Sequence, residues 1–174
     1  KILSQLRKMG VTSIELGAQS MDDRVLSLNR RGHVSADVER ASCLIRENGF
    51  SLGLQMMTGL YGDTAEGAWR TARALAALCP DTMRIYPAIV MKNTQLARWY
   101  AAGEYVPVSL EQAVELCADL LDYFESKGIR VIRLGLHDGS QLEKERIAGP
   151  WHPAFRELCE SRRYFKKARV LLER

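Results

Sequence analysis

Residues 50–78, FSLGLQMMTGLYGDTAEGAWRTARALAAL, decide the fold. The run at 50–57 is mostly apolar and leads into a glycine-containing turn, a combination that predicts a strand. Asp63 or Thr64 then provides a side chain that caps a helix, and Pro80 ends it because proline disfavours helical geometry in the residue before it. A strand that leads through a turn into a helix is the unit from which helix-covered parallel sheets are built.

The same alternation continues on both sides of this segment. On the N-terminal side we expect a helix at 1–10, a strand at 12–16, a short helix after Asp22 and Asp23, and a helix at 35–48 capped by Ser35, with Val38, Ala41, Leu44 and Ile45 facing the core. On the C-terminal side we expect strands at 83–90 and 129–134, and helices at 94–102 and 110–127, the second behind a capping box of Ser109 and Gln112. Pro87 has no amide hydrogen and predicts an edge strand or a bulge. Four strands in this order fit an open sheet or an arc of a barrel, and periodicity does not choose between them.

The composition is that of an ordinary globular domain. Of the 174 residues, 47% are hydrophobic and 26% charged, and no apolar run approaches the roughly 20 residues needed to span a bilayer. The start lacks the apolar centre of a signal peptide, so we expect a cytoplasmic protein. A net charge of +4 permits a nucleic-acid partner without identifying one. Because Lys1 falls inside a helical pattern, we expect the sequence to begin within a longer protein.

The four cysteines do not have the spacing of a metal site. Cys43, Cys79, Cys117 and Cys159 are far apart in the sequence, and each lies in an apolar helical pattern. This placement predicts four buried thiols and no metal ligand. Their even number would also allow disulfides, but nothing else in the sequence favours them.

Polar side chains follow the predicted strands at four places where a parallel sheet would bind a ligand. The first is 17–20 (GAQS), where Gln19 offers an amide that can donate and accept hydrogen bonds. The second is 29–33 (NRRGH), where the planar guanidinium of Arg31 suits a carboxylate or a phosphate. The third is Gln55, which needs a polar partner within an apolar strand, and the fourth is the glycine-rich turn 59–64.

Several polar residues have both a structural and a chemical interpretation. Glu15 fits an ion-paired sheet residue or a catalytic base. His33 and His137 lie in predicted loops, where solvated side chains are the simpler interpretation, and His152 fits a packed corner or a site. The sequence leaves the roles of all four open.

The C-terminal segment contains a basic run. Arg162, Arg163, Lys166, Lys167 and Arg169 fit the solvated face of a terminal helix whose apolar side is formed by Tyr164, Phe165, Val170 and Leu171. Contact with RNA is the alternative interpretation of the same residues.

Three segments together resemble one known family. They are ELGAQSMDDRVLSLNRRGH at 15–33, LQMMTGLYGDT at 54–64 and MRIYPAIV at 83–90. In order and spacing they are similar to the region that follows the cluster motif in radical S-adenosylmethionine (SAM) proteins related to the Elongator catalytic subunit and, more distantly, to oxygen-independent coproporphyrinogen oxidase. Tyr61 departs from the pattern, because that family has proline at this position.

The resemblance implies an α/β fold in which residues 1–136 form the later, parallel strands of a partial (β/α)6 TIM-like barrel. Residues 137–174 would form a C-terminal loop and helical extension. The family holds a [4Fe-4S] cluster through a CxxxCxxC motif, which is absent here and is expected upstream of Lys1. The metal ligands would therefore lie outside this chain, and we expect the chain alone to be inactive.

The resemblance also implies an activity for the parent protein. Such enzymes reductively cleave SAM at the cluster to start radical chemistry, and the likeness to the Elongator subunit suggests tRNA modification. Gln19 and Arg31 match positions that bind SAM in the family, and Gln55 occupies a position that is acidic in coproporphyrinogen oxidase. No catalytic residue is assigned. The alternatives are a nonenzymatic RNA-binding α/β module and a purely structural domain.

Overall fold

The computed structural model describes residues 2–136 and 140–173, without the side chains of residues 140–142. Its elements in chain order are α1 (Ile2–Lys8), β1 (Ser13–Gln19), α2 (Asp23–Leu28), α3 (Ser35–Glu47), β2 (Ser51–Thr58), α4 (Ala65–Ala77), β3 (Thr82–Pro87), β4 (Val90–Met91), α5 (Gln95–Ala101), α6 (Leu110–Ser126), β5 (Arg130–Leu134), α7 (Ser140–Glu145), β6 (Arg146–Ala148) and α8 (Phe155–Leu172). The strands and helices expected from the sequence up to β5 are all present, with ends shifted by a few residues.

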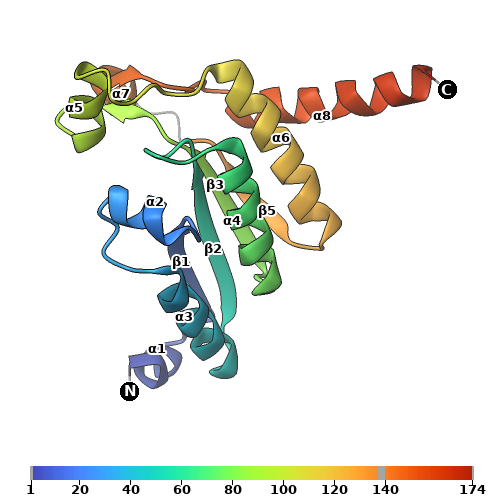
Figure 1. Ribbon diagram of the computed structural model, residues 1–174. Helices are drawn as coiled ribbons and strands as arrows, with labels where there is room; N and C mark the ends of the chain where they lie inside the picture. The colour runs from blue at the N-terminus through green and yellow to red at the C-terminus, as the bar shows by residue number, and fades with distance from the viewer. Residues whose placement is uncertain (1, 137–139, 174) are drawn as a thin grey trace.

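Four of the strands form a parallel sheet in the order β1-β2-β3-β5. Helices α3, α4 and α6 lie along this sheet, while α5, α7 and the small β4-β6 sheet lie together near one of its ends (Figure 1). The predicted α/β class with parallel strands is therefore confirmed.

One face of the sheet carries the hydrophobic core. Leu52, Leu54 and Met56 alternate along β2 and are at most 1% exposed, as expected for side chains that point toward covering helices. They belong to the same buried cluster as Leu75 of α4 and Phe124 of α6. Because alternate residues of a strand point to opposite faces, the intervening residues lie on the other face.

That second face is polar and holds an ion pair. Arg84 of β3 contacts Glu15 of β1 at 2.7 Å, although β2 lies between the two strands. The pair crosses β2 at Gly53, where a Cβ would lie only 2.6 Å from Glu15 Cγ and 3.0 Å from Thr82 Oγ1. The glycine thus leaves the space through which the two side chains meet. The hydrogen bonds that Arg84 donates to the Glu15 carboxylate raise the pKa of Arg84, and this geometry supports the structural interpretation of Glu15.

The expectation for Pro87 is wrong. Strand β3 lies inside the sheet between β2 and β5, and Pro87 is its last residue. The missing donor costs no ladder bond there, because the next amide, Ala88 N, donates to Thr58 O at 2.8 Å. The chain then leaves the main sheet, and Val90–Met91 forms the separate antiparallel sheet with β6.

Helix α3 begins differently from the prediction. Val34, not Ser35, is the N-cap residue, and its amide donates to Asp37 Oδ2 at 2.9 Å. The Ser35 amide instead donates to Asp23 Oδ1 of α2, at 2.7 Å. The buried residues of α3 are Val38, Ser42 and Ile45, while Leu44 is 51% exposed, so its expected place in the core was wrong. By contrast, the Ser109 and Gln112 capping box of α6 is confirmed.

The prediction of four buried cysteines is half wrong. Cys117 and Cys159 are buried, whereas Cys43 and Cys79 are exposed. Burial raises the pKa of the Cys117 thiol, and it raises the pKa of Cys159 to about 12. Cys43 is on the same outward side of α3 as Leu44, and Cys79 follows the end of α4 with φ 52°. Apolar neighbours in the sequence did not identify the buried side of either segment.

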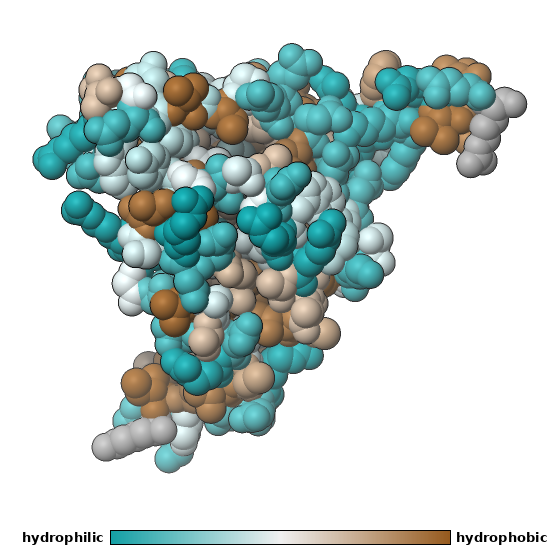
Figure 2. Space-filling view, in the orientation of Figure 1, coloured by the Kyte–Doolittle hydropathy of each residue, from teal (hydrophilic) through white to brown (hydrophobic). Residues whose placement is uncertain are grey.

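Helix α8 is oriented opposite to the expectation. Its basic residues face the acidic side of α6, where Arg163 contacts Asp122 at 2.7 Å and Glu125 at 2.6 Å, and Lys166 pairs with Asp119 at 2.5 Å. The residues expected on its buried side are 52–70% exposed: Tyr164, Phe165, Val170 and Leu171. The helix extends beyond the body of the protein, and Figure 2 shows hydrophobic residues at its far end.

No helix among the described residues is long and apolar enough to cross a membrane.

Candidate functional site

The four polar segments expected to hold a ligand come together at one end of the sheet. Gln55 Nε2 of β2 lies 3.5 Å from Gln19 Oε1 of β1. His33 contacts the carbonyl oxygen of Ala18 at 3.1 Å, and Asn29 contacts the turn at Tyr61 at 2.9 Å. Residues that are separated by up to 36 positions in the sequence therefore share one site.

Gln19 is held in an unusual conformation at the end of β1. The pairing of β1 with β2 shifts register between Gly17 and Gln19, and Gln19 has φ 65°, in the left-handed region that non-glycine residues seldom adopt. Its side chain folds back over Gly17, where a Cβ would lie 2.5 Å from Gln19 Nε2. The residue is only 5% exposed. Gly17 thus provides the space that the Gln19 amide occupies.

A hydroxyl pair fixes the chain after Gln19. Ser20 Oγ and Thr71 Oγ1 of α4 lie 3.3 Å apart, and the Met21 amide donates to Thr71 Oγ1 at 3.1 Å. The Asp22 amide donates to Ser20 Oγ, and the Asp22 carboxylate caps α2 by accepting from Arg24 and Val25. The end of β1 is therefore tied to both the helix that follows it and the helix that follows β2.

The loop after α2 is anchored to the glycine-rich turn. Asn29 Nδ2 donates to Tyr61 O at 2.9 Å, and Asn29 Oδ1 accepts from Tyr61 N at 3.3 Å. Arg24 Nη2 donates to the neighbouring Gly62 O at 2.9 Å. Gly62 has φ 77°, which favours glycine, and a Cβ there would lie 2.6 Å from Leu28 Cδ1 of α2. The sequence analysis placed Asn29 in the candidate segment 29–33 but gave it no role of its own.

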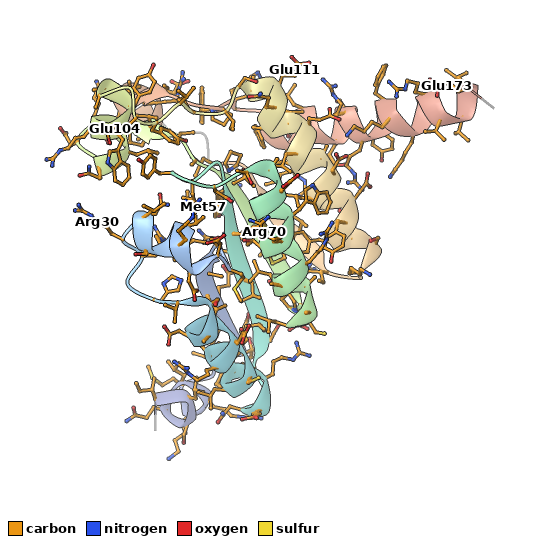
Figure 3. All side chains as sticks on the ribbon, viewed as in Figure 1. Arg30, Met57, Arg70, Glu104, Glu111 and Glu173 are labelled. Carbon is orange, nitrogen blue, oxygen red and sulfur yellow. The ribbon has the colours of Figure 1, made fainter. Side chains whose placement is uncertain are left out.

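Arg31 is exposed at the edge of this anchored loop. Within residues 2–136 and 140–173, its guanidinium makes no hydrogen bond or ion pair. Its backbone is fixed, because Arg31 N donates to Leu26 O at 3.0 Å and Arg31 O accepts from His33. The preceding residue, Arg30, extends away from the molecule (Figure 3). A cationic group with five donors is thus available on a loop that His33 links to the end of β1.

The glycine-rich turn carries an aromatic cluster. Tyr61, at the position where the family has proline, stacks on Trp99 with ring centroids 4.3 Å apart. Tyr105 meets the Tyr61 ring edge-on, and its hydroxyl donates to Gly59 O at 2.7 Å. Burial raises the pKa of Tyr105 to about 12, so the hydroxyl keeps its proton at neutral pH. The stack provides a contact that proline could not make in the same way, and the turn keeps its shape.

Two hollows lie near this end of the sheet. One of about 460 Å³ is lined by the glycine-rich turn together with Arg24, Glu104 and Tyr105. Another of about 810 Å³ lies between α4 and α6 and includes Asp63 and Trp69, but none of Gln19, Arg31 or Gln55. Partial burial raises the pKa of Asp63. Gln19, Arg31 and Gln55, the residues expected to bind a cofactor, line neither of these two hollows.

The remaining histidines have structural contacts or are not described. His152 Nδ1 accepts from Ala154 N at 3.0 Å at the start of α8, which supports the interpretation as a packed corner. His137 lies outside the described residues. His33 is different, because both of its ring nitrogens contact carbonyl oxygens of the site.

Comparison with known families agrees with this geometry. The model of the radical SAM superfamily matches residues 1–75, and the model of the Radical_SAM C-terminal domain matches residues 80–167. The chain belongs to the radical SAM superfamily. Between them the two matches include the predicted site and most of the helical part that follows it.

Two curated relatives show one branch of the radical SAM superfamily to which the chain is similar. The chain is 34% identical over 121 residues to a tRNA uridine(34) acetyltransferase of Dehalococcoides mccartyi, which covers 68% of this chain and 26% of the relative. It is 30% identical over 124 residues to Elongator complex protein 3 of Homo sapiens, which covers 68% of this chain and 22% of the relative. The chain thus spans about a quarter of the length of these relatives.

Solved radical SAM structures have the same fold. Elp3 of the archaeon Methanocaldococcus infernus superposes with a TM-score of 0.84 at 25% identity, over 95% of this chain and 38% of that one. Coproporphyrinogen III oxidase of Escherichia coli gives a TM-score of 0.58 at 21% identity, over 73% and 29% respectively, a likeness of fold alone. The predicted resemblance to both groups is confirmed.

The radical SAM family implies two groups, and the residues present fit only one of them. Cys117 and Cys159 are both buried in the core between α6 and α8, and Cys43 and Cys79 are exposed elsewhere. The described residues contain no group of three or more His, Cys, Asp or Glu side chains that could hold a metal ion. We therefore assign no cluster ligand within these residues. SAM, in contrast, carries a carboxylate and ribose hydroxyls, which suit the free guanidinium of Arg31 and the amides of Gln19 and Gln55.

Proposed function

We propose that this chain is part of an enzyme that holds SAM at the ends of β1 and β2 and acts on tRNA. The observation that carries the proposal is that Arg31, whose guanidinium has no hydrogen bond or ion pair within the described residues, lies on a loop that His33 links to the end of β1. The last residue of that strand is the buried Gln19, and the chain belongs to the radical SAM superfamily. The names of the relatives, among them a tRNA uridine(34) acetyltransferase, support tRNA as the substrate. We also propose a cytoplasmic location, as expected for a tRNA-modifying enzyme.

Each of the three residues has a distinct part in the proposed binding. Arg31 would pair with the carboxylate of SAM through two parallel N–H donors, a geometry that lysine cannot reproduce. Gln19 and Gln55 would hydrogen-bond hydroxyl or amino groups, since an amide both donates and accepts. A reduced [4Fe-4S] cluster would supply the electron that cleaves SAM, and these residues would hold and orient SAM for that reaction.

We propose that the cluster ligands are supplied from outside residues 1–174. On this view residues 1–136 contribute the later part of the barrel and residues 137–174 an extension, and the isolated chain does not cleave SAM. The alternative of a nonenzymatic RNA-binding module uses the basic terminal helix and the arginines at the strand ends. The basic residues of the helix are largely used in ion pairs with α6, so this alternative keeps only the strand-end arginines as support.

The test uses the full-length protein that contains this chain. After anaerobic reconstitution with iron and sulfide, we expect reduced protein to convert SAM into 5'-deoxyadenosine, detected by chromatography, whereas the 174-residue chain treated identically should form none. Addition of tRNA should change the rate for the full-length protein. If the full-length protein takes up no cluster, or if the short chain forms 5'-deoxyadenosine on its own, the proposal is wrong.

A further inference from the structure

His33 links the two ends of the proposed SAM site through backbone contacts. Its Nε2 lies 3.1 Å from Ala18 O, at the end of β1, and its Nδ1 lies 3.2 Å from Arg31 O. The first of these contacts spans 15 residues, whereas the second is local. The imidazole therefore lies between the peptide that precedes Gln19 and the residue expected to bind the SAM carboxylate.

The partners of this ring show what it does. Both are carbonyl oxygens, which only accept hydrogen bonds, so each ring nitrogen must donate to be satisfied. A neutral ring donates to one of the two carbonyls, and a doubly protonated ring donates to both. Because both nitrogens are directed at the protein backbone, the ring is not placed to exchange a proton with a substrate. Its role is to hold the loop against the strand.

The loop needs such a contact because its backbone is unusual. Arg30 and Gly32 both have positive φ, 52° and 72°, so the chain reverses sharply on either side of Arg31. On one side Asn29 ties the loop to Tyr61, and on the other His33 ties it to β1. Ala18 O is itself fixed, because it also accepts from Ser20 N at 2.7 Å. The two ties together determine where the Arg31 side chain begins.

We propose that His33 is a positioning residue that sets Arg31 relative to Gln19 for the binding of SAM, through its contact with Ala18 O. This inference rests on the proposed function. His33 touches no ligand itself in this role. The long-range bond is the essential one, because the local bond to Arg31 O moves with the loop and cannot fix the loop to the strand.

Two conservative substitutions separate the two hydrogen bonds. In His33→Gln the side-chain amide nitrogen is placed approximately where Nε2 was and can still donate to Ala18 O. In His33→Asn the shorter amide can reach only the position of Nδ1, near Arg31 O. We expect His33→Gln to bind SAM nearly as tightly as the original protein, and His33→Asn and His33→Ala to bind about threefold to tenfold more weakly, the cost of one hydrogen bond.

The measurement is the dissociation constant for SAM by equilibrium dialysis, with the reconstituted full-length protein. His152→Asn is the matched control, because its side-chain oxygen can still accept from Ala154 N and it lies away from the site. It should leave the dissociation constant unchanged. Urea unfolding of every variant identifies any that fails to fold, and His33→Gln provides the comparison if His33→Ala does not fold.

The outcomes distinguish this inference from the proposed function. If the unsubstituted protein does not bind SAM, the proposed function fails, and the inference fails with it. If it binds SAM but His33→Asn and His33→Ala bind equally well, the inference alone is wrong. Weak binding by His33→Gln, matching that of His33→Ala, would also overturn it, because the bond to Ala18 O would then not be what positions the site.

Discussion

The loop after α2 and the contact between α6 and α8 are both rich in arginine, yet they use it in opposite ways. Arg163 of α8 is 9% exposed and contacts three carboxylates, those of Asp122, Glu125 and Glu160. Arg31 is exposed, and its guanidinium has no partner within the described residues. In the first region the side chain donates to two carboxylates of α6 and to one of its own helix, and so joins the two helices. In the second, only the backbone is used and the charge is left available.

This difference separates structural from functional charge without reference to any relative. A guanidinium that is paired on several sides has little left with which to recognise a ligand. One that is fixed through its backbone but unpaired at its head group has lost conformational freedom without gaining a partner, an arrangement that favours binding of an anion. The basic run of α8 therefore mainly joins helices, whereas the head group of Arg31 is available for the anion that we propose it binds.

The sharpest test of the comparison is removal of the free guanidinium. We expect Arg31→Ala in the reconstituted full-length protein to weaken SAM binding by about 10- to 100-fold, the range for a charge-assisted hydrogen bond. The midpoint of urea unfolding should hardly change, because the side chain makes no contact within the described residues. Equilibrium dialysis and urea titration measure the two quantities.

Arg30→Ala is the matched control for this substitution. Arg30 is the neighbouring residue, carries the same charge and extends away from the molecule (Figure 3). Its loss removes the same long-range charge without removing a donor from the site, so the affinity for SAM should stay within about twofold, as expected for a screened surface charge. Equal losses in the two variants would mean that charge alone, and not the position of Arg31, attracts the ligand.

The sequence alone could predict where the polar segments meet but not the place of α8. The strand ends and the glycine turn predicted where polar side chains would meet, because the carboxyl ends of parallel strands lie at one edge. The left-handed Gln19, its space over Gly17 and the bridge from Asn29 to Tyr61 have no sequence signal of their own. They depend on long-range contacts that only the folded chain shows.

Helix α8 was misinterpreted because charged residues were assumed to face solvent. The alternative signal was present in α6, whose residues Glu111, Glu115, Asp119 and Asp122 recur at helical spacing and form an acidic side. An acidic side on one helix and a basic side on the next predict an interhelical contact when the two pack together. The corresponding assumption that apolar residues are buried misplaced Leu44 and Cys43, which are both exposed.

Removal of Arg163 should lower the stability of the protein and leave SAM binding intact, the reverse of what we expect for Arg31→Ala. We expect Arg163→Met to lower the free energy of unfolding by about 1–3 kcal/mol, less than for a fully buried pair because the three carboxylates are partly solvated. SAM affinity should be unchanged. Arg169→Met is the control, since its pair with Glu173 is about two-thirds exposed on both sides and should cost at most about 0.5 kcal/mol. Equal costs in urea titrations would refute a structural role for Arg163.

The ion pair of Glu15 and Arg84 across β2 is intermediate between Arg31, whose guanidinium has no partner within the described residues, and Arg163, which contacts three carboxylates. Gly53→Ala would place a Cβ 2.6 Å from Glu15 Cγ, so Glu15 must move and its contact with Arg84 must change. We expect a loss of about 1–2 kcal/mol in the free energy of unfolding, as for a small overpacking substitution. In a Glu15→Ala background the nearest obstruction, Glu15 Cγ, is gone and only the 3.0 Å contact with Thr82 Oγ1 remains, so the same substitution should cost clearly less. A loss that is the same in both backgrounds would show that the pair does not depend on this glycine.

The smallest expected effect concerns acid. Burial alone would raise the pKa of Asp122, but the hydrogen bonds from Arg163 and Lys167 outweigh it and lower that pKa; a hydrogen bond from Lys166 likewise lowers the pKa of Glu115. A carboxyl whose folded pKa is lowered adds stability above its unfolded pKa of about 4, and that stability is lost as the pH falls through the folded value. The difference in free energy of unfolding between the original protein and Arg163→Met should therefore be largest near pH 7 and become smaller below about pH 4. Urea titrations across this range would contradict the assignment if the difference stayed constant or widened toward low pH.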